Sequence, residues 1–228
     1  MNEKEICFIM CVNNDFLANE CQLYINQLII PEGYSIDIIS VKDAPSMTSG
    51  YNAAMNSSNA KYKIYLHQDV LIVNKNIVND LLSVFHSNSS IGMIGIVGNR
   101  KLGIDGCPWS EGSVRIGRLL HDLILENSYS SFNEIKGLYE EVIAIDGLFI
   151  ATSQDIQWRE DLFTGWDMYD LSQSIEFRKA GYKVVVPNTD HPWCLHDNDI
   201  IDLTNYQKWL NVFKNEYHKE LKDWIHCD

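Results

Sequence analysis

The chain has 228 residues, of which 46% are hydrophobic and 11% aromatic. This composition excludes a disordered chain and predicts one domain over residues 1–228 with a packed core. A formal net charge of −13 argues against a protein that binds nucleic acid by neutralising many phosphates. The charge of an anionic ligand must therefore be balanced within its site, by a metal ion or a few basic groups.

The chain carries no recognisable targeting or membrane segment. Its opening residues, MNEKEICFIMCV, contain two acids and a short apolar run, unlike the basic start and longer apolar core of a secretory signal. No stretch approaches the roughly 20 apolar residues of a membrane-spanning helix. Six scattered cysteines without a repeated CxxC spacing favour reduced core thiols in a cytoplasmic protein. Cys194 and His196 form a Cys-x-His pair, but structural zinc needs about four ligands and is disfavoured.

Short apolar runs recur along the chain, with helical patterns between the early ones. Near-continuous apolar runs are typical of strands that helices cover on both faces. We predict strands at 6–12, 36–41, 62–66, 91–98, 142–151 and 182–187. We predict helices over 15–29, 46–59 and 76–86. This βαβα order indicates an α/β fold with a mostly parallel central sheet flanked by helices.

The pattern loosens between residues 100 and 140 into a polar stretch rich in Ser and Asn. Long segments without periodicity inside a compact domain are usually functional or mobile. We therefore predict a loop that orders when a ligand binds. Its basic residues would then meet the negative charge of the ligand; they are Arg100, Lys101, Arg115 and Arg118.

Two helical patterns occupy the last third of the chain. One covers 170–181 and is closed by Gly181. The other, over 203–225, is predicted as a single C-terminal helix with Trp209 and Phe213 among its apolar residues. Packing of this helix on the domain is the favoured interpretation, and peripheral contact with a partner or a membrane surface is the alternative.

Common nucleotide-binding fingerprints are absent from the sequence. Gly92, Gly95 and Gly98 are spaced GxxGxxG inside an apolar strand-like run, which differs from the GxGxxG of a strand-to-helix turn. No Walker phosphate loop is present either. Nicotinamide-dependent and ATP-hydrolysing enzymes of the common kinds are therefore disfavoured.

Three acidic or histidine clusters border strand-like runs. They are LHQDV at 66–70, GWDMYDLSQS at 165–174 and HPWCLHDND at 191–199. Open α/β sheets bind ligands outside the carboxyl ends of their strands, so we expect the clusters to converge at one sheet edge. Taken alone, Asp170 is equally well explained as a helix N-cap, and His196 is more often a structural imidazole than a metal ligand.

The order and spacing of these clusters resemble glycosyltransferase family two with the A-type nucleotide-sugar fold. The resemblance is greatest to the subgroup of glycosyltransferase-like domains named from streptomycin-biosynthesis gene clusters. It rests on LHQDV, AIDGLFIATSQDIQWREDLFTGWDMYDLSQSIEFRKAGYKVVVP and PWCLHDND, and more loosely on IISVKDAPSMTSGYNAAMNSS. It implies transfer of a sugar from a nucleotide-sugar donor to an unidentified hydroxyl acceptor in carbohydrate biosynthesis, with inversion and a divalent metal.

In that family an Asp-x-Asp motif contacts the donor and the metal. Here His67 and Gln68 stand in the first two positions, where donor contacts are implied, and only Asp69 matches. We therefore predict that Asp69 holds the metal, and His196 matches the late histidine that completes the site in some members. Carboxylate and diphosphate oxygens suit Mg²⁺ or Mn²⁺, and an imidazole ligand favours Mn²⁺.

The nucleotide is predicted to lie over the ends of the first strands. Asn13 and Asn14 follow the first predicted strand, and the resemblance implies that Asp43 faces the base; an ordinary turn residue is the alternative. Asn52, in the loosely matching segment, is assigned to the same site. Gly147 either permits a close approach of the backbone to the ligand or marks a strand irregularity.

Attack by the acceptor hydroxyl requires a carboxylate that takes its proton. Asp170 matches the second acid of the Glu-Asp motif of the family, with Tyr169 replacing the first, so we predict Asp170 as the general base. Asp167 is the alternative base. Trp166 is predicted to line the sugar pocket, with a buried aromatic residue as the alternative.

Two rival hypotheses remain open. The altered His67-Gln68-Asp69 and Tyr169-Asp170 motifs are compatible with a non-catalytic domain of the same fold that binds nucleotide or carbohydrate. A glycoside hydrolase with paired acids is the other rival, and nucleotide binding would argue against it because its acids need no nucleotide.

Overall fold

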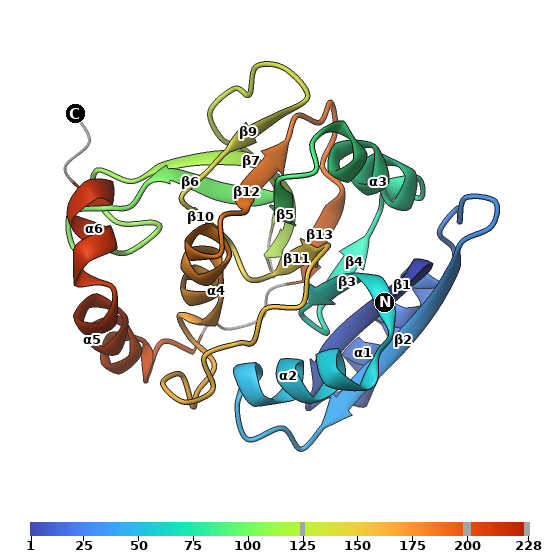
Figure 1. The fold of residues 1–228 in the computed structure, drawn as a ribbon, viewed down its shortest axis with the longest axis horizontal. Coiled ribbons are helices and arrows are strands. Elements are labelled where there is room, and N and C mark those ends of the chain that lie inside the picture. The colour runs from blue at the N-terminus through green and yellow to red at the C-terminus, as the bar shows by residue number, and fades with distance from the viewer. Residues whose placement is uncertain (124–125, 198–201, 226–228) are drawn as a thin grey trace.

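The computed structural model describes residues 1–123, 126–197 and 202–225 as a mixed α/β fold (Figure 1). The strands of its central sheet are β1 (Asn2–Val12), β2 (Ser35–Lys42), β3 (Ala60–Leu66), β5 (Ile91–Gly95), β9 (Tyr139–Glu141), β11 (Phe149–Thr152) and β12 (Lys183–Pro187). Their order across the sheet is β2-β1-β3-β11-β5-β12-β9. The predicted α/β fold class is confirmed.

The central sheet is less parallel than the sequence predicts. Three of its pairs are parallel, β1 with β2, β1 with β3 and β5 with β12. β11 is antiparallel to both of its neighbours, and β9 is antiparallel to β12. The predicted strand over 142–151 is interrupted before β11, since its first residues belong to another sheet. An apolar run indicates burial, but it does not encode strand direction.

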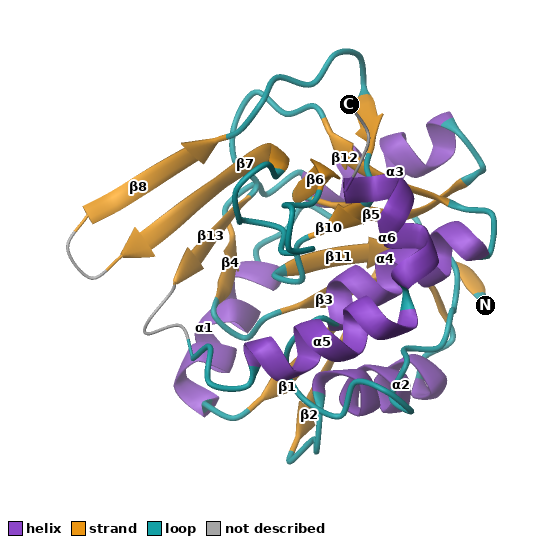
Figure 2. Ribbon diagram, turned by 90° about the vertical axis from the view of Figure 1, so that its left-hand side faces the viewer, coloured by secondary structure: helices purple, strands orange, loops and turns teal. Residues whose placement is uncertain are grey.

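A smaller sheet lies beside the carboxyl end of β3. Its strands are β4 (Val70–Ile72), β6 (Val97–Lys101), β7 (Val114–Leu123), β8 (Glu126–Ser131), β10 (Ala144–Ile145) and β13 (Cys194–Asp197). Their order is β10-β6-β7-β13-β4, and β8 pairs with β7. Figure 2 shows the β7–β8 hairpin extending beyond the rest of the molecule. The predicted loop over 100–140 is therefore wrong, because much of this segment forms strands.

The helices are α1 (Asp15–Ile25), α2 (Met47–Ser57), α3 (Ile77–Ser87), α4 (Tyr169–Lys179), α5 (Tyr206–Glu216) and α6 (His218–Ile225). The four predicted helices that correspond to α1–α4 are confirmed, although α1 ends earlier than predicted. The C-terminal segment forms two helices instead of the single helix predicted over 203–225. Tyr217 interrupts them with φ −102° and ψ 27°. No glycine or proline marks this break in the sequence.

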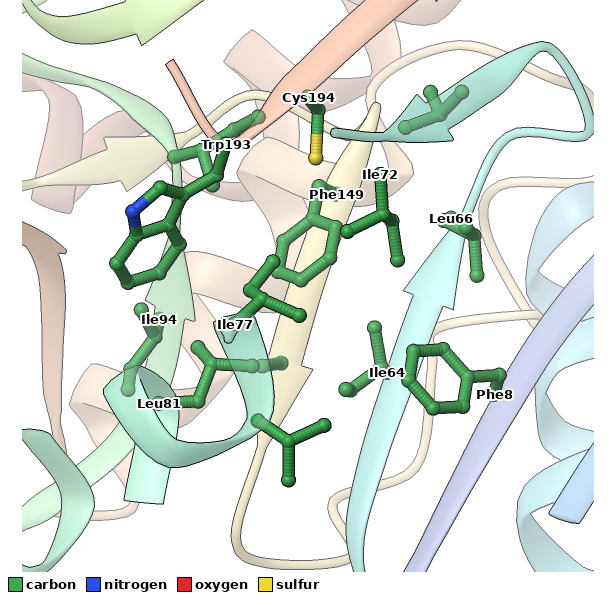
Figure 3. Close-up of a cluster of buried hydrophobic side chains, with 14 of the residues drawn as sticks. Phe8, Ile64, Leu66, Ile72, Ile77, Leu81, Ile94, Phe149, Trp193 and Cys194 are labelled. Carbon is green, nitrogen blue, oxygen red and sulfur yellow. The ribbon is translucent and has the colours of Figure 1, made fainter. Parts of the chain in front are cut away.

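Alternate residues of β1 face two different hydrophobic clusters. Phe8 and Met10 belong to a cluster with residues of α1 and α3, part of which Figure 3 shows. Cys7 and Ile9 belong to a cluster with residues of α2 and α4. Helices therefore cover both faces of the sheet, as predicted. The five cysteines within the described residues are free and buried, so the prediction of core thiols is confirmed for them; Cys227 lies outside the described residues.

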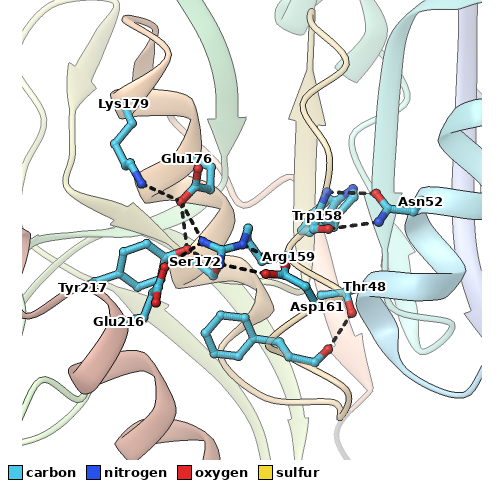
Figure 4. Close-up of polar contacts among 11 residues, drawn as sticks. Thr48, Asn52, Trp158, Arg159, Asp161, Ser172, Glu176, Lys179, Glu216 and Tyr217 are labelled. Atoms are coloured by element: carbon cyan, nitrogen blue, oxygen red, sulfur yellow. Dashed lines mark hydrogen bonds and ion pairs between the residues drawn. The ribbon is translucent and has the colours of Figure 1, made fainter.

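The C-terminal helices pack on α4. Trp209 and Phe213 of α5 are buried in a third hydrophobic cluster together with residues of α4. Polar contacts reinforce this packing, since Arg159 pairs with Glu216 at 3.0 Å and the Tyr217 hydroxyl donates to Glu176 at 3.0 Å (Figure 4). The favoured interpretation of the tail is confirmed. Among the described residues, no helix combines the length and the hydropathy that crossing a bilayer requires.

Candidate active site

A cavity of about 530 Å³ opens beside the carboxyl end of β3. Its wall is built from the β3–β4 turn, β7, the chain between β10 and β11, the start of α4, β13 and the segment before α5. All three clusters singled out in the sequence contribute to it. The predicted site residues among its lining are His67, Asp69, Gly147, Trp166, Asp167, Asp170 and His196.

His67, Asp69 and His196 form a compact group of candidate metal ligands. Each offers a donor atom, and these atoms all lie within 4.8 Å of one another. The Oδ1 atom of Asp69 lies 3.4 Å from Nε2 of His196 and 3.9 Å from Nδ1 of His67. This oxygen is buried and makes no hydrogen bond within the described part of the chain. A buried carboxylate oxygen facing two imidazoles fits a divalent cation such as Mn²⁺.

The protonation states of this group suit metal binding. Burial and the neighbouring His196 lower the pKa of His67, which favours the neutral imidazole. Burial alone would raise the pKa of Asp69, but its contacts with His196 and His67 outweigh burial and lower that pKa. Metal ligands must be deprotonated, so a neutral imidazole beside an ionised carboxylate is the required state.

Strand pairing brings the two histidines together. His67 and Asp69 lie in the turn between β3 and β4, and β13 pairs with β4 so that His196 faces Val70. The backbone N–H of Asp197 donates to the carbonyl of Asp69 at 2.9 Å, which fixes β13 against the turn. Residues far apart in the sequence are thereby held in one cluster.

Asp170 lies in the first turn of α4 at the wall of the same cavity. Its Oδ2 accepts the Gly147 N–H at 2.9 Å, and its Oδ1 accepts the Leu171 N–H at 2.8 Å. The N-cap of α4 is Met168, with φ 63°, so the N-cap alternative for Asp170 is wrong. Burial, followed by the charge of Asp146, raises the pKa of Asp170 to about 7. Such a carboxyl suits proton transfer near neutral pH.

Asp146, Arg115 and His121 line the cavity as well, and sequence reasoning assigned none of them a place in the metal or catalytic site. Asp146 pairs with Arg115, with 3.3 Å between Oδ2 and the guanidinium, and Arg115 lies over the ring of Phe132. Asp146 directly follows β10, as Asp69 closely follows β3, so its position was a usable signal. Of the four basic residues predicted to meet ligand charge, Arg115 lines this cavity, whereas Arg100 pairs with Glu140.

Trp166 and Asp167 lie at the rim, just before α4. Trp166 is 49% exposed and lines the cavity, so the alternative of a buried aromatic residue is wrong. Asp167 is half-buried, and burial together with the charge of Asp202 raises its pKa. A flat aromatic surface beside an acid is suited to contact a sugar ring and its hydroxyl groups.

Comparison with known proteins decides the family. The model of the glycosyltransferase-like family matches residues 7–217. The chain belongs to this family. The resemblance inferred from the sequence is therefore confirmed at the family level, and a comparison with curated proteins found no match.

Solved structures share the fold of this glycosyltransferase-like chain at low sequence identity. TarS from S. aureus in complex with UDP-GlcNAc aligns with a TM-score of 0.58 and 9% identity over 99% of this chain and 68% of that one. The mannosyltransferase PcManGT from Pyrobaculum calidifontis, in complex with GDP-Man and Mn²⁺, aligns with a TM-score of 0.58 and 9% identity over 98% and 65% of the two chains. Another TarS structure aligns with a TM-score of 0.56 and 10% identity over 93% of this chain. The alignment covers only 39% of the length of that TarS chain.

Three of the residues predicted for the nucleotide side, Asn13, Asn14 and Asp43, lie at the carboxyl ends of β1 and β2, outside the lining of the cavity. Gln68 accepts the backbone N–H groups of Asn13 at 3.0 Å and Asn14 at 2.9 Å, so it ties the end of β1 to the β3–β4 turn. Asn14 also caps α1 by accepting from Phe16. Asp43 is exposed, with φ 56°. Gln68 and Asn14 thus have structural contacts that sequence reasoning did not foresee.

Asn52 does not belong to the nucleotide side. Its side chain is buried, donates to the carbonyl of Trp158 at 3.0 Å and accepts the Trp158 N–H at 2.9 Å (Figure 4). Both ends of its amide are therefore used to hold the segment before α4 against α2. This corrects the assignment of Asn52 to the nucleotide site.

Gly147 makes its close approach to a side chain of the same protein. A Cβ atom at this position would lie 2.2 Å from the hydroxyl oxygen of Tyr169 and 2.6 Å from the neighbouring ring carbon. The missing side chain thus leaves room for the Tyr169 phenol. A close approach of this backbone to a ligand stays a prediction, because Gly147 also lines the cavity.

We expect Gly147→Ala to destabilise the protein by about 1–3 kcal/mol, because the added methyl group must displace the Tyr169 phenol from a packed position. Urea unfolding of the two proteins measures this difference. Gly147→Ala in a Tyr169→Phe background is the control. The Tyr169 hydroxyl oxygen, the atom nearest to the added methyl group, is then absent, so the loss of stability should be smaller. Unchanged stability in the single variant would contradict the packing described here.

Proposed function

We propose that the protein transfers a sugar from a nucleotide-sugar donor to a hydroxyl acceptor, using a divalent cation held by Asp69, His196 and His67. The observation that carries the proposal is the buried Asp69 oxygen, which lacks a hydrogen bond and faces two imidazoles in the cavity that also contains Asp170. Membership of the glycosyltransferase-like family supports this chemistry. An acidic chain binding a diphosphate has particular need of a cation.

Two of the similar structures support the class of donor. TarS is described in complex with UDP-GlcNAc, and PcManGT in complex with GDP-Man and Mn²⁺. Both ligands are nucleotide sugars, and one structure includes Mn²⁺, which a mixed carboxylate and imidazole group suits better than it suits Mg²⁺. These relatives therefore support a nucleotide-sugar donor and a Mn²⁺ site in this chain.

Each group at the cavity has a defined part in the proposed reaction. Asp170 takes the proton of the acceptor hydroxyl as this oxygen attacks the anomeric carbon. Arg115 and Trp166 line the cavity, and we assign the diphosphate contact to Arg115 and the sugar contact to Trp166. When bound, the cation stabilises the negative charge that develops on the leaving diphosphate. A single displacement of this kind inverts the configuration at the anomeric carbon.

Incubation with UDP-sugars and GDP-sugars in the presence of Mn²⁺ tests turnover. We expect release of the nucleoside diphosphate, slowly to water and faster when a suitable acceptor is added. The matched control is Asp170→Asn, which should bind the donor without releasing product at a comparable rate. Donor binding without turnover by the wild-type protein would favour the non-catalytic binding domain instead.

A further inference from the structure

The two residues that replace motif acids, His67 and Tyr169, are in direct contact. The hydroxyl oxygen of Tyr169 lies 2.5 Å from Nε2 of His67. His67 comes from the β3–β4 turn and Tyr169 from the start of α4, so this contact joins two walls of the cavity. A hydrogen bond this short between partly buried groups restricts the orientation of the imidazole.

The contact has a consequence for the other nitrogen of His67. Nδ1 is the nitrogen that lies 3.9 Å from Asp69 and therefore faces the candidate metal cluster. A ligating nitrogen needs a free lone pair, and a neutral imidazole carries one proton. The proton must then be on Nε2, which donates it to the Tyr169 oxygen. Such outer partners commonly fix the tautomer of a metal-bound histidine.

Tyr169 is itself held rigidly. It is 4% exposed, and its ring lies 5.9 Å from that of Tyr51 and 6.1 Å from that of Trp158, centroid to centroid. Gly147 gives it space on the side facing the β10–β11 segment. That segment is hydrogen-bonded to both walls. The backbone N–H of His67 donates to the Leu148 carbonyl at 3.1 Å, and the backbone N–H of Gly147 donates to Oδ2 of Asp170. The phenol therefore has little freedom to leave His67.

We infer that Tyr169 is a positioning residue, which holds His67 as the Nε2–H tautomer with Nδ1 turned toward Asp69 and His196. As far as it concerns metal binding, this inference rests on the proposed function. The His67 and Tyr169 replacements then act as one unit. They also link the candidate metal cluster to the turn of α4 that carries Asp170.

Nitrogen-15 NMR of the imidazoles in metal-free protein tests the tautomer without any turnover. The chain has seven histidines, so the spectrum of a His67→Gln variant assigns the His67 signals. We expect the wild type to carry the proton on Nε2, and Tyr169→Phe to shift His67 toward a mixture of tautomers. Tyr51→Phe is the matched control. It removes a buried hydroxyl from the same group of aromatic residues, but the Tyr51 hydroxyl donates to the Leu66 carbonyl and not to His67. An Nδ1–H tautomer in the wild type, or an unchanged spectrum in Tyr169→Phe, overturns the inference.

Calorimetric titration with Mn²⁺ supplies the second readout. We expect Tyr169→Phe to bind Mn²⁺ about 10- to 100-fold more weakly, the usual effect of removing an outer partner, and Tyr51→Phe to bind it as the wild type does. Equal loss of affinity in both variants would reveal a general packing effect and overturn the inference. If the wild type binds no Mn²⁺, the proposed metal site fails, and the NMR spectra still decide the role of Tyr169.

Discussion

We expect Asp170→Asn to lower the rate of the proposed sugar transfer by about 100-fold or more, the usual scale of losing a general base. Asn has nearly the same shape, and its carbonyl oxygen can still accept one of the backbone N–H groups that Asp170 now binds. Folding and metal-dependent donor binding should therefore stay near those of the wild type. Steady-state transfer assays combined with calorimetry separate these effects.

Asp167→Asn is the matched control for this experiment. Asp167 lines the same cavity and also has a raised pKa, but it lies at the rim before α4. We expect its replacement to affect transfer far less than Asp170→Asn. If Asp170→Asn transfers sugar at close to the wild-type rate, Asp170 is structural, and Asp167 becomes the candidate base.

The pH dependence of activity follows from the same carboxyl. A general base works only when deprotonated, and the pKa of Asp170 is raised to about 7, so kcat/KM should increase with pH and level off above that value. The effect on stability has the opposite sign. The folded protein holds the proton more tightly than the unfolded chain, so the contribution of Asp170 declines as pH rises from its ordinary pKa of 3.8 toward 7. Asp170→Asn should remove both dependences.

We expect Asp69→Asn to lose most of the proposed affinity for Mn²⁺. The substitution removes the carboxylate from the candidate metal cluster and leaves two imidazoles, which bind the cation without balancing its charge. We expect the affinity for Mn²⁺ to fall by at least about 100-fold. Removing a residue that only supports a ligand typically costs about 10- to 100-fold, and removing the ligand itself should cost as much or more. His196→Ala should weaken binding less, since the carboxylate remains. Electron paramagnetic resonance of free Mn²⁺ measures each affinity.

Asp146→Asn is the control for the Asp69 variant, because Asp146 is an acid of the same cavity that lies outside the cluster. Thermal unfolding should show that Asp69→Asn is folded. Wild-type affinity for Mn²⁺ in Asp69→Asn would exclude this carboxylate as a ligand and remove the basis of the proposed metal site.

The sequence predicts the helices and the convergence of the site better than it predicts the sheets. The four helical patterns follow from local periodicity, and the three polar clusters were visible as acids and histidines beside strand-like runs; the structure brings residues of all three clusters to one cavity. The antiparallel direction of β11 has no local signature, since a buried run looks the same in both directions. Strand β8 was missed because its sequence, ENSYSS, has no apolar repeat, and β7 was missed because the alternation begun by Val114 and Ile116 breaks at Arg118.

Site residues were missed where their contacts depend on tertiary packing. Asn52 carries the same side chain whether it binds a ligand or the Trp158 backbone, and only the position of α2 against the segment before α4 distinguishes the two. The contact between Tyr169 and His67 joins segments from opposite parts of the chain, so no spacing rule reveals it. Asp146 is different, because its place after a strand was visible.

Calorimetric titration of the wild-type protein with UDP and with GDP, in Mn²⁺ and again in a chelator, tests the central claim most directly. The cavity contains a buried carboxylate oxygen suited to a cation. Asp146 already balances part of the charge of Arg115, so a diphosphate that contacts Arg115 still depends mainly on the metal for its charge to be balanced. We predict clearly tighter binding of at least one of the two nucleotides with Mn²⁺ than with the chelator. Equal affinity under both conditions, or binding of neither nucleotide, would contradict a metal-dependent nucleotide-sugar site in this protein.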